Sequence, residues 1–229
     1  MEENSLGGFV IDMSEVAFGY KGKLVIGGVD LQIHEGELIG IAGGHGTGKS
    51  TLLKGLLGLV KPLYGQIQIF GFPGVTTISK LKRHLGYVPQ APALDWRFPV
   101  VVREVVLMGK DARLGLRKRP LLKECQKVER LLVDLEIGDL STVPIQHLSD
   151  EELRRMLIAR ALATEPRILC VDQPTAALDE PSEVAILDLL AFLVKSRGLT
   201  VVLVGNDQAK MLQRADRVVS LDDLAVNFG

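Results

Sequence analysis

Cysteine is scarce in this chain. Its 229 residues include only Cys125 and Cys170, which lie far apart and lack the spacing of metal ligands. Two such thiols provide no disulfide framework, and we expect them to be buried and reduced in an intracellular protein. An excess of charge of either sign is also absent, because the formal net charge is −1. No general electrostatic attraction to nucleic acid or to anionic lipid is therefore expected.

Long apolar runs are missing as well. Residues 62–79 carry no charge but are interrupted by Pro, Gly and Gln. Because a membrane-spanning helix needs about 20 predominantly apolar residues, the chain is not expected to cross a membrane by itself. Residues 1–8 carry acids and glycines where a secretory signal would have a basic start and an apolar run. A hydrophobic content of 47% with 24% charged residues is typical of a globular protein with a full core.

Apolar runs bounded by glycine or charge predict the strands of the fold. These runs are Phe9–Phe18, Leu31–His34, Leu38–Ala42, Gln66–Phe70, Leu85–Pro89, Ile168–Asp172, Thr200–Val204 and Arg217–Ser220. Some stretches, such as Ile168–Val171 and Val201–Val204, are continuously apolar, which is typical of a parallel sheet covered on both faces. Helical periodicity predicts a second set of segments. These are Lys49–Leu59, Val101–Met108, Leu121–Leu135, Asp150–Ala163, Pro181–Ser196 and Gln208–Gln213.

Strand signals disappear between Ala91 and Thr164, where helical patterns dominate. We therefore predict a single domain over residues 1–229. In it, residues 9–90 and 165–229 form an α/β core, and residues 91–164 form an inserted helical subdomain.

A phosphate-binding motif follows the predicted strand Leu38–Ala42. It fits GxxxxGK[ST] and consists of Gly43, Gly44, His45, Gly46, Thr47, Gly48, Lys49, Ser50 and Thr51. The glycines let the backbone curl so that its N–H groups face phosphate oxygens, and the start of the next helix adds its positive dipole end. Lys49 is expected to reach the β- and γ-phosphates, and the Ser50 hydroxyl to bind Mg²⁺. A glycine-rich turn that happens to precede a helix is the alternative.

A candidate metal-binding carboxylate lies about 120 residues further on. Asp172 ends the apolar run that begins at Ile168, and a carboxylate at the end of a buried strand needs a task to offset its burial. Beside a P-loop, Asp172 can hold Mg²⁺ through a water molecule. An apolar run ending in Asp is common by itself, so this interpretation depends on the P-loop.

The order of these motifs resembles that of the ATP-binding subunits of ABC transporters, over residues 10–229. The matching positions are the P-loop, Gln90, Leu148-Ser149, Asp172, Ala177-Leu178-Asp179 and Asn206-Asp207. The resemblance implies a P-loop NTPase core with a parallel sheet flanked by helices, an antiparallel β edge region and an inserted helical subdomain. It also implies ATP and Mg²⁺ as ligands, a polytopic membrane permease as partner, a homodimer or heterodimer of ATP-binding subunits, and a location at the cytoplasmic face of the cell membrane.

The resemblance also assigns roles to single residues. Tyr20 matches the aromatic residue that stacks on adenine, with a core or turn tyrosine as the alternative. Gln90 matches the glutamine that senses Mg²⁺ and couples to the helical subdomain, and Asp179 belongs to the D-loop. The patterns in Asp95–Val100 and Val105–Gly109 are similar to those of the manganese, zinc and iron importers within this family.

A basic run at Arg113–Arg119 also has a family counterpart. A solvated loop is the favoured alternative for such a charge run.

Three departures from the family pattern affect positions that act on ATP. The signature motif, normally LSGGQ, consists here of Leu148, Ser149, Asp150, Glu151 and Glu152. Gln173 replaces the glutamate expected after Asp172, and Asn206 replaces the switch histidine. An amide cannot accept a proton from the attacking water, and removal of a general base typically lowers the rate ~10²–10⁴-fold. Asn206 is shorter than histidine and cannot become cationic.

In the signature, acids replace glycines that normally let the backbone approach a phosphate. One carboxylate ~7 Å from a phosphate charge costs roughly 2 kcal/mol at an effective dielectric of about 20, so closure of two subunits over ATP is opposed. In this family each ATP lies between one P-loop and the signature of the partner. Neither site would therefore be complete, in a homodimer or beside an intact partner.

The sequence thus predicts a transporter subunit that binds ATP–Mg²⁺ and hydrolyses ATP weakly or not at all. A fully active ATPase that drives manganese, zinc or iron uptake is the main alternative. A soluble ABC protein of repair or translation usually carries two cassettes or long insertions, and this chain has one cassette without them. A P-loop kinase is disfavoured by the Leu148-Ser149 and Ala177-Leu178-Asp179 motifs.

Overall fold

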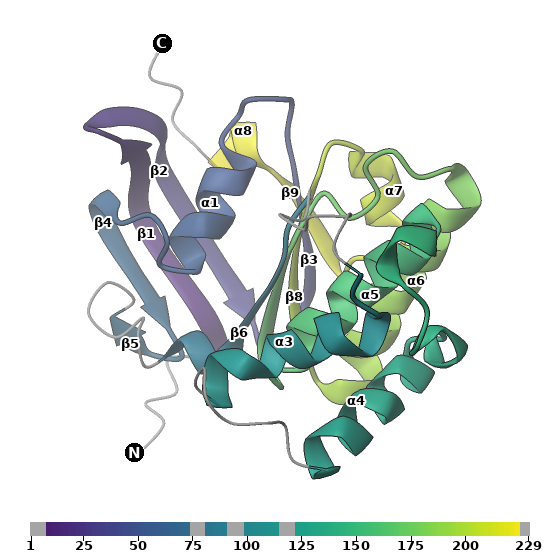
Figure 1. Cartoon of the computed structure of the whole chain (residues 1–229). Helices are drawn as coiled ribbons and strands as arrows, with labels where there is room; N and C mark the ends of the chain where they lie inside the picture. Colours follow the sequence, from purple (N-terminus) through teal and green to yellow (C-terminus); the bar gives the residue numbers. More distant parts are fainter. Residues whose placement is uncertain (1–7, 74–80, 91–98, 115–121, 225–229) are drawn as a thin grey trace.

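The computed structural model of the chain describes residues 8–73, 81–90, 99–114 and 122–224 (Figure 1). Its strands are β1 Phe9–Tyr20, β2 Lys23–His34, β3 Leu38–Ala42, β4 Pro62–Ile69, β5 Phe72–Pro73, β6 Leu85–Val88, β7 Ile168–Asp172, β8 Thr200–Gly205 and β9 Arg217–Ser220. Its α-helices are α1 Lys49–Leu56, α3 Val102–Leu114, α4 Leu122–Asp134, α5 Asp150–Leu162, α6 Glu180–Arg197, α7 Gln208–Leu212 and α8 Leu221–Leu224. Across these residues, no helix combines the length and apolar character that a bilayer crossing requires.

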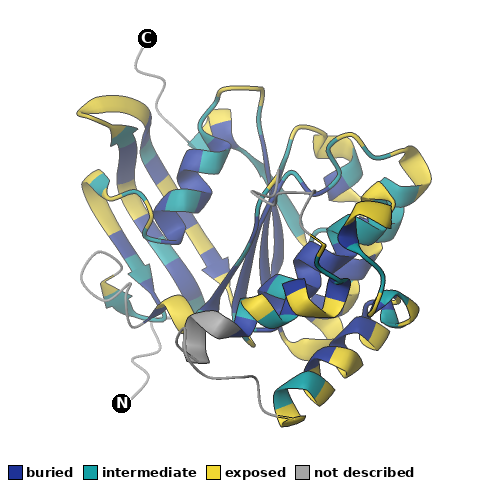
Figure 2. Cartoon of the chain, in the orientation of Figure 1, coloured by how far each residue is buried: buried dark blue, intermediate teal, exposed yellow. Residues whose placement is uncertain are grey.

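A parallel sheet with the order β6-β7-β8-β3-β9 forms the centre of the molecule. Every residue of β3 and β7 is buried, which explains why these strands are apolar throughout instead of alternating. Figure 2 shows the strands at the centre of this sheet as buried, with helices of mixed exposure beside them. The predicted parallel sheet flanked by helices is confirmed.

An antiparallel sheet with the order β2-β1-β4-β5 forms the other layer, and it confirms the expected antiparallel region. The prediction that β2 begins at Leu31 is wrong, because the strand starts at Lys23. Half of this segment is polar or glycine, so no apolar run marks it. Pairing with the long strand β1 supplies its hydrogen bonds, and only alternate side chains, such as Val29 and Ile33, enter the core.

Two hydrophobic cores lie on opposite faces of the parallel sheet. One joins β7 and β8, through Cys170 and Val202, to α1 and to Phe18 of the antiparallel sheet. The other joins the alternate residues Leu169 and Val171 to α3, α5 and α6. The Cys170 side chain is fully buried, and this burial raises the pKa of its thiol to about 12. Cys125 is only half-buried, so the expectation of burial holds fully for one of the two cysteines.

Between β6 and β7 the described residues form α3, α4, α5 and short 3-10 turns, joined by a bridge between Val101 and Pro144. Figure 1 places these helices on the side of the parallel sheet away from the antiparallel sheet. The bounds of a separate subdomain at residues 91–164 stay a prediction.

The predicted end of a helix at Met108 is wrong, because α3 continues to Leu114. Gly109 interrupts the apolar pattern there, and a Cβ at this position would lie 2.1 Å from the Arg160 carbonyl oxygen. Glycine is therefore needed for close packing of α3 against α5. Lys110 is also buried, but it pairs with Glu124 of α4, which offsets the cost of burying its charge.

Candidate nucleotide-binding site

Most of the predicted site residues meet at one edge of the parallel sheet. The P-loop follows β3, and Asp172 is the last residue of β7. Gln90 lies just beyond β6, and Asn206 directly follows β8. Because all these strands run parallel, their carboxyl ends share one edge, which is where ligands bind in open α/β sheets.

The P-loop leads into α1 with an open helix N-terminus. Gly48 caps the helix at φ 99°, a conformation that favours glycine. In the described structure no side chain caps this end, and the first turn of α1 contains no acid. The first backbone N–H groups of the helix and its positive dipole end thus remain available to an anion.

Lys49 lies over the P-loop that precedes it. Its Nζ donates hydrogen bonds to the carbonyl oxygens of Gly43, at 2.7 Å, and of Gly44. The side chain is only 4% exposed. Burial lowers the pKa of this ammonium group, while the charges of Asp172 and Asp222 act in the opposite direction. Lys49 is therefore held where a phosphate would enter, beside two carboxylates.

Asp172 offers an unused ligand to a cation. Its carboxylate is 3% exposed, and Oδ2 accepts a hydrogen bond of 3.3 Å from the Tyr87 hydroxyl. Oδ1 is buried and has no hydrogen-bond partner among the described residues. A buried, unpaired carboxylate oxygen is costly, and a cation or its bound water would satisfy it. Asp172 together with the Ser50 hydroxyl therefore fits Mg²⁺, which prefers oxygen ligands.

Tyr87 was not recognised from the sequence as part of the site. It lies on β6, beside β7, and its hydroxyl reaches Asp172. Burial is the main cause that raises the pKa of Tyr87 to about 12, and the neighbouring Asp172 charge adds to it. The signal was the aromatic residue in the stretch Tyr87–Gln90, three positions before the recognised glutamine.

The two substituted polar positions are held by other site residues. Gln90 Nε2 donates to Gln173 Oε1 at 3.2 Å, so two amides occupy the place between β6 and β7. Gln173 has φ 46°, and its backbone N–H donates to the Val204 carbonyl oxygen of β8. Asn206 Nδ2 lies 3.2 Å from Nε2 of His45 in the P-loop.

The signature segment forms a closed helix N-terminus at α5. Ser149 is the N-cap residue and takes part in a capping box with Glu152. Glu152 Oε2 accepts from the Ser149 backbone N–H at 2.8 Å, and the Ser149 hydroxyl lies 2.9 Å from the same oxygen. Glu151 pairs with Arg155 at 2.8 Å. The acids that depart from the family pattern are thus good N-terminal residues for a helix.

Arg154 is a second residue that was missed. Its guanidinium donates to the carbonyl oxygens of Gln90 and Ala176, so it joins α5 to the Gln90 segment and to the turn before α6. Burial lowers the pKa of Arg154, against the influence of the Asp150 charge. Leu148–Glu152 itself does not meet the P-loop within this chain in any described hydrogen bond.

Two further predicted site residues lie at the margins. Tyr20 is 46% exposed at the end of β1, and the β1–β2 hairpin approaches the P-loop at Ile26, whose Cβ would lie 3.2 Å from a Cβ placed on Gly48. Asp179 caps α6 by accepting from the Ser182 backbone N–H at 3.1 Å. Hydrogen bonding from Ser182 lowers the pKa of Asp179.

Some predicted features fall outside the described residues, namely Asp95–Phe98 and most of the basic run Arg113–Arg119. The short helix α8 was not predicted. It packs on the P-loop, because a Cβ on Gly43 would lie 3.4 Å from the Leu221 Cβ, and it brings Asp222 towards Lys49.

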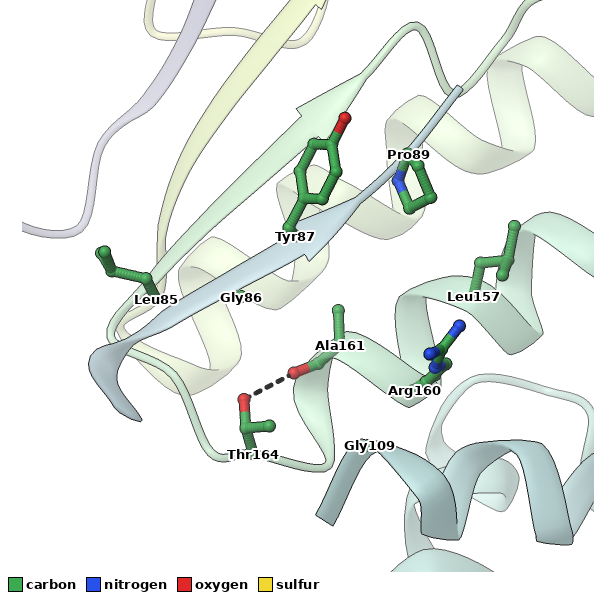
Figure 3. A pocket seen from close by; sticks show the side chains of 9 residues that line it. All are labelled: Leu85, Gly86, Tyr87, Pro89, Gly109, Leu157, Arg160, Ala161 and Thr164. Carbon is green, nitrogen blue, oxygen red and sulfur yellow. Dashed lines mark hydrogen bonds between the residues drawn. The ribbon is translucent and has the colours of Figure 1, made fainter. Parts of the chain in front are cut away.

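A cavity of about 370 Å³ lies apart from the P-loop, between β6, α3 and α5 (Figure 3). Its lining consists of Leu85, Gly86, Tyr87, Pro89, Gly109, Leu157, Arg160, Ala161 and Thr164. Figure 3 shows the Tyr87 hydroxyl pointing away from these helices, which agrees with its hydrogen bond to Asp172. Because no P-loop residue lines this cavity, it is not where the phosphates would lie.

Comparison with known proteins agrees with this geometry. The family described as ABC transporter matches residues 26–176, so the chain belongs to this family, as an ATP-binding domain. It is 37% identical over 221 residues to the manganese transport system ATP-binding protein MntB of Bacillus subtilis, covering 96% of this chain and 86% of that protein. It is 35% identical to the zinc transport system ATP-binding protein TroB of Treponema pallidum, covering 97% and 82%.

Solved structures support the same fold. CbiO1 from Clostridium perfringens, part of the ABC transporter complex cbiONQ, matches with a TM-score of 0.82 and 30% identity, covering 93% of this chain and 84% of that one. The ATP-binding cassette MJ0796, in a dimeric post-hydrolysis state with ADP and Pi, matches with a TM-score of 0.76 and 30% identity, covering 93% and 94%. The expected α/β P-loop NTPase fold is confirmed.

Proposed function

We propose that this chain is the ATP-binding subunit of a manganese or zinc importer, and that it binds ATP–Mg²⁺ but hydrolyses ATP slowly. The substrate class rests on the relatives, which are named as manganese and zinc transport proteins. The observation that carries the rest is the contrast between a complete P-loop with Asp172 and an amide, Gln173, at the position after it.

Binding follows from the groups at the carboxyl edge of the sheet. The open N-terminus of α1 supplies N–H groups to the phosphates. Lys49 exchanges its hydrogen bonds with Gly43 and Gly44 for phosphate oxygens. Ser50, Gln90 and Asp172 hold Mg²⁺, which neutralises phosphate charge when bound. Tyr20 stacks on the adenine.

Slow hydrolysis follows from the residue beyond Asp172. A water molecule that attacks the γ-phosphate must lose a proton, and the Gln173 amide cannot accept it. Its side-chain oxygen is also engaged by Gln90. Because general-base removal typically lowers a rate ~10²–10⁴-fold, hydrolysis by the isolated chain is expected near background.

Assembly follows the family arrangement. Two ATP-binding subunits, identical or different, pair head to tail beneath a polytopic permease, at the cytoplasmic face of the membrane. Leu148–Glu152 of one subunit then faces ATP on the other, with Asp179 in the D-loop nearby. The acids of the signature oppose this closure, so transport depends on ATP binding or on the partner chain.

Calorimetry on the purified chain tests the binding half of this proposal. Wild type should bind ATP with Mg²⁺, and Lys49→Ala should weaken the affinity at least about tenfold, since a hydrogen bond to a charged group is lost. Lys54→Ala, on the same helix α1, is the matched control and should bind as wild type does. Equal affinity of Lys49→Ala and wild type would overturn the assignment of the phosphate site.

Phosphate release at steady state, with and without the co-expressed permease, tests the hydrolytic half. A wild-type rate on the order of 1 s⁻¹ or more, as is common for enzymes, would instead support the alternative of a fully active ATPase that drives metal uptake.

A further inference from the structure

The P-loop of this chain carries an imidazole next to the position where the family's switch histidine is missing. His45 lies between two glycines of the loop, and its Nε2 is 3.2 Å from Asn206 Nδ2. The two residues are 161 positions apart in the sequence and meet because β3 and β8 are neighbouring parallel strands, with Ala42 opposite Gly205.

The hydrogen bond between them fixes which nitrogen of His45 carries a proton. In the amide orientation of the structure, the Asn206 NH₂ group faces His45 Nε2, and an amide NH₂ can only donate. Nε2 must therefore accept, and the proton of a neutral imidazole lies on Nδ1. Asn206 thus orients the ring and leaves Nδ1–H free as a donor.

The position of the pair suits a donor to the terminal phosphate. Both side chains are exposed, so no part of the fold buries them away from a ligand. On the same loop, Lys49 Nζ bonds to the carbonyl oxygen of Gly44, the residue before His45. On the neighbouring strand, Gln173 N–H bonds to Val204, two residues before Asn206. The imidazole therefore lies between the phosphate-binding lysine and the position that would hold the attacking water.

We propose that His45 contacts the γ-phosphate of ATP through Nδ1–H, in place of a switch-loop histidine, and that Asn206 is the positioning residue that orients its ring. The two loops have in effect exchanged roles: the imidazole comes from the P-loop, and the polar support comes from the loop after β8. This inference rests on the proposed binding of ATP, and it changes the meaning of Asn206 from a lost contact to a relocated one.

The ratio of ADP to ATP dissociation constants tests this proposal, because only ATP has a γ-phosphate. Calorimetric titration with each nucleotide and Mg²⁺ should show that His45→Ala weakens ATP about tenfold, as for loss of a hydrogen bond to a charged group, and leaves ADP unchanged. Asn206→Ala should lower the same ratio by a smaller factor. His34→Ala, which removes an exposed imidazole at the end of β2, is the matched control and should leave the ratio as in wild type.

An exchange variant sharpens the test. His45→Asn combined with Asn206→His returns the imidazole to the loop after β8 and should restore the ratio closer to wild type than His45→Asn alone. A ratio no better than that of the single variant would overturn the exchange. Equal weakening of ATP and ADP in His45→Ala would show that His45 only shapes the loop, and an unchanged ratio would show that it does not meet the γ-phosphate. If wild type bound neither nucleotide, the proposed function itself would fall, and this inference with it.

Discussion

Two helix N-termini in this molecule differ in how they treat an anion. At the start of α1, Gly48 provides no side chain and the first turn has no acid. At the start of α5, Ser149 and Glu152 cap each other and Asp150 and Glu151 fill the first turn. The same backbone dipole acts at both ends. One end is left open to a phosphate, and the other already holds carboxylates of its own chain.

This comparison teaches that the changes in the signature are coherent for folding although they are adverse for ATP. The capping box and the pair between Glu151 and Arg155 satisfy the helix that they begin, so α5 needs no ligand for its stability. A helix N-terminus cannot serve its own carboxylates and a partner's phosphate at once. The predictions below alter one end at a time.

The largest effect is expected when both ends of the catalytic arrangement are restored together. The variant combines Gln173→Glu, Asn206→His, Asp150→Gly, Glu151→Gly and Glu152→Gln. It should raise steady-state ATP hydrolysis by at least ~10²-fold, because a general base is regained and closure is no longer opposed. Phosphate release is the measurement.

The matched control for this variant keeps the acids of α5 and changes only Gln173→Glu and Asn206→His. It should gain less, because the subunits still close poorly over ATP. If the five-position variant is as slow as wild type, then the defect lies in the assembly and not in these residues.

A smaller effect is expected on association alone. With Gln173 left in place, restoring glycine at Asp150 and Glu151 should tighten ATP-dependent dimerisation by about 30-fold, the equivalent of roughly 2 kcal/mol for one carboxylate near a phosphate. Sedimentation velocity with ATP and Mg²⁺ measures it. Adding Lys49→Ala, which removes ATP binding, is the control and should abolish the gain. Tighter association without ATP would contradict the electrostatic explanation.

The capping box should contribute measurably to stability. Ser149→Ala removes the N-cap side chain of α5 and should lower the free energy of unfolding by ~1 kcal/mol, as measured by urea denaturation. Ser196→Ala, near the other end of the exposed face of α6, is a matched control in which only a local bond to the Phe192 carbonyl is lost, and its change should stay within about 0.5 kcal/mol. Equal effects would mean that the closed end of α5 is not specially stabilised.

The smallest effect concerns alkaline pH at the open edge. Because the folded pKa of Tyr87 is about 12, above its unfolded value of about 10, the neutral tyrosine favours the folded state. This contribution is full below pH ~10 and is lost as the pH rises towards 12. In Tyr87→Phe, the loss of stability across this window should be shallower. The absorbance of ionised tyrosine that disappears in Tyr87→Phe should be the part that rises near pH 12, and a lower midpoint would contradict the packing of Tyr87 against Asp172.

Local patterns predicted the P-loop, the apolar strand that ends in Asp172, and most helices and strands, because each depends on neighbouring residues. Contacts between distant segments could not be predicted in this way. Tyr87 meets Asp172, Arg154 meets Gln90, and neither pair shares a sequence pattern. The partnership of Asn206 with His45 was missed for the same reason, although both residues had been named separately.

One signal was present in the sequence and was interpreted for only one of its meanings. Ser149 followed by Glu152 is the pattern of a capping box, but comparison with the family signature drew attention to what the acids remove. The boundaries failed where burial replaced pattern. The helix α3 runs past Gly109 because that glycine allows contact with Arg160, and the paired Lys110 follows it into the interior.

Cys170, sealed in the middle of β7 between the two cores, makes the chain a recorder of its own opening. An alkylating reagent needs the thiolate, and burial keeps this thiol both covered and protonated. Cys125, half-buried on α4, is more accessible and marks the elapsed time of exposure to reagent. Because a ligand that binds the folded chain makes unfolding rarer, the label acquired by Cys170 relative to Cys125 counts how often the sheet separates, with and without nucleotide.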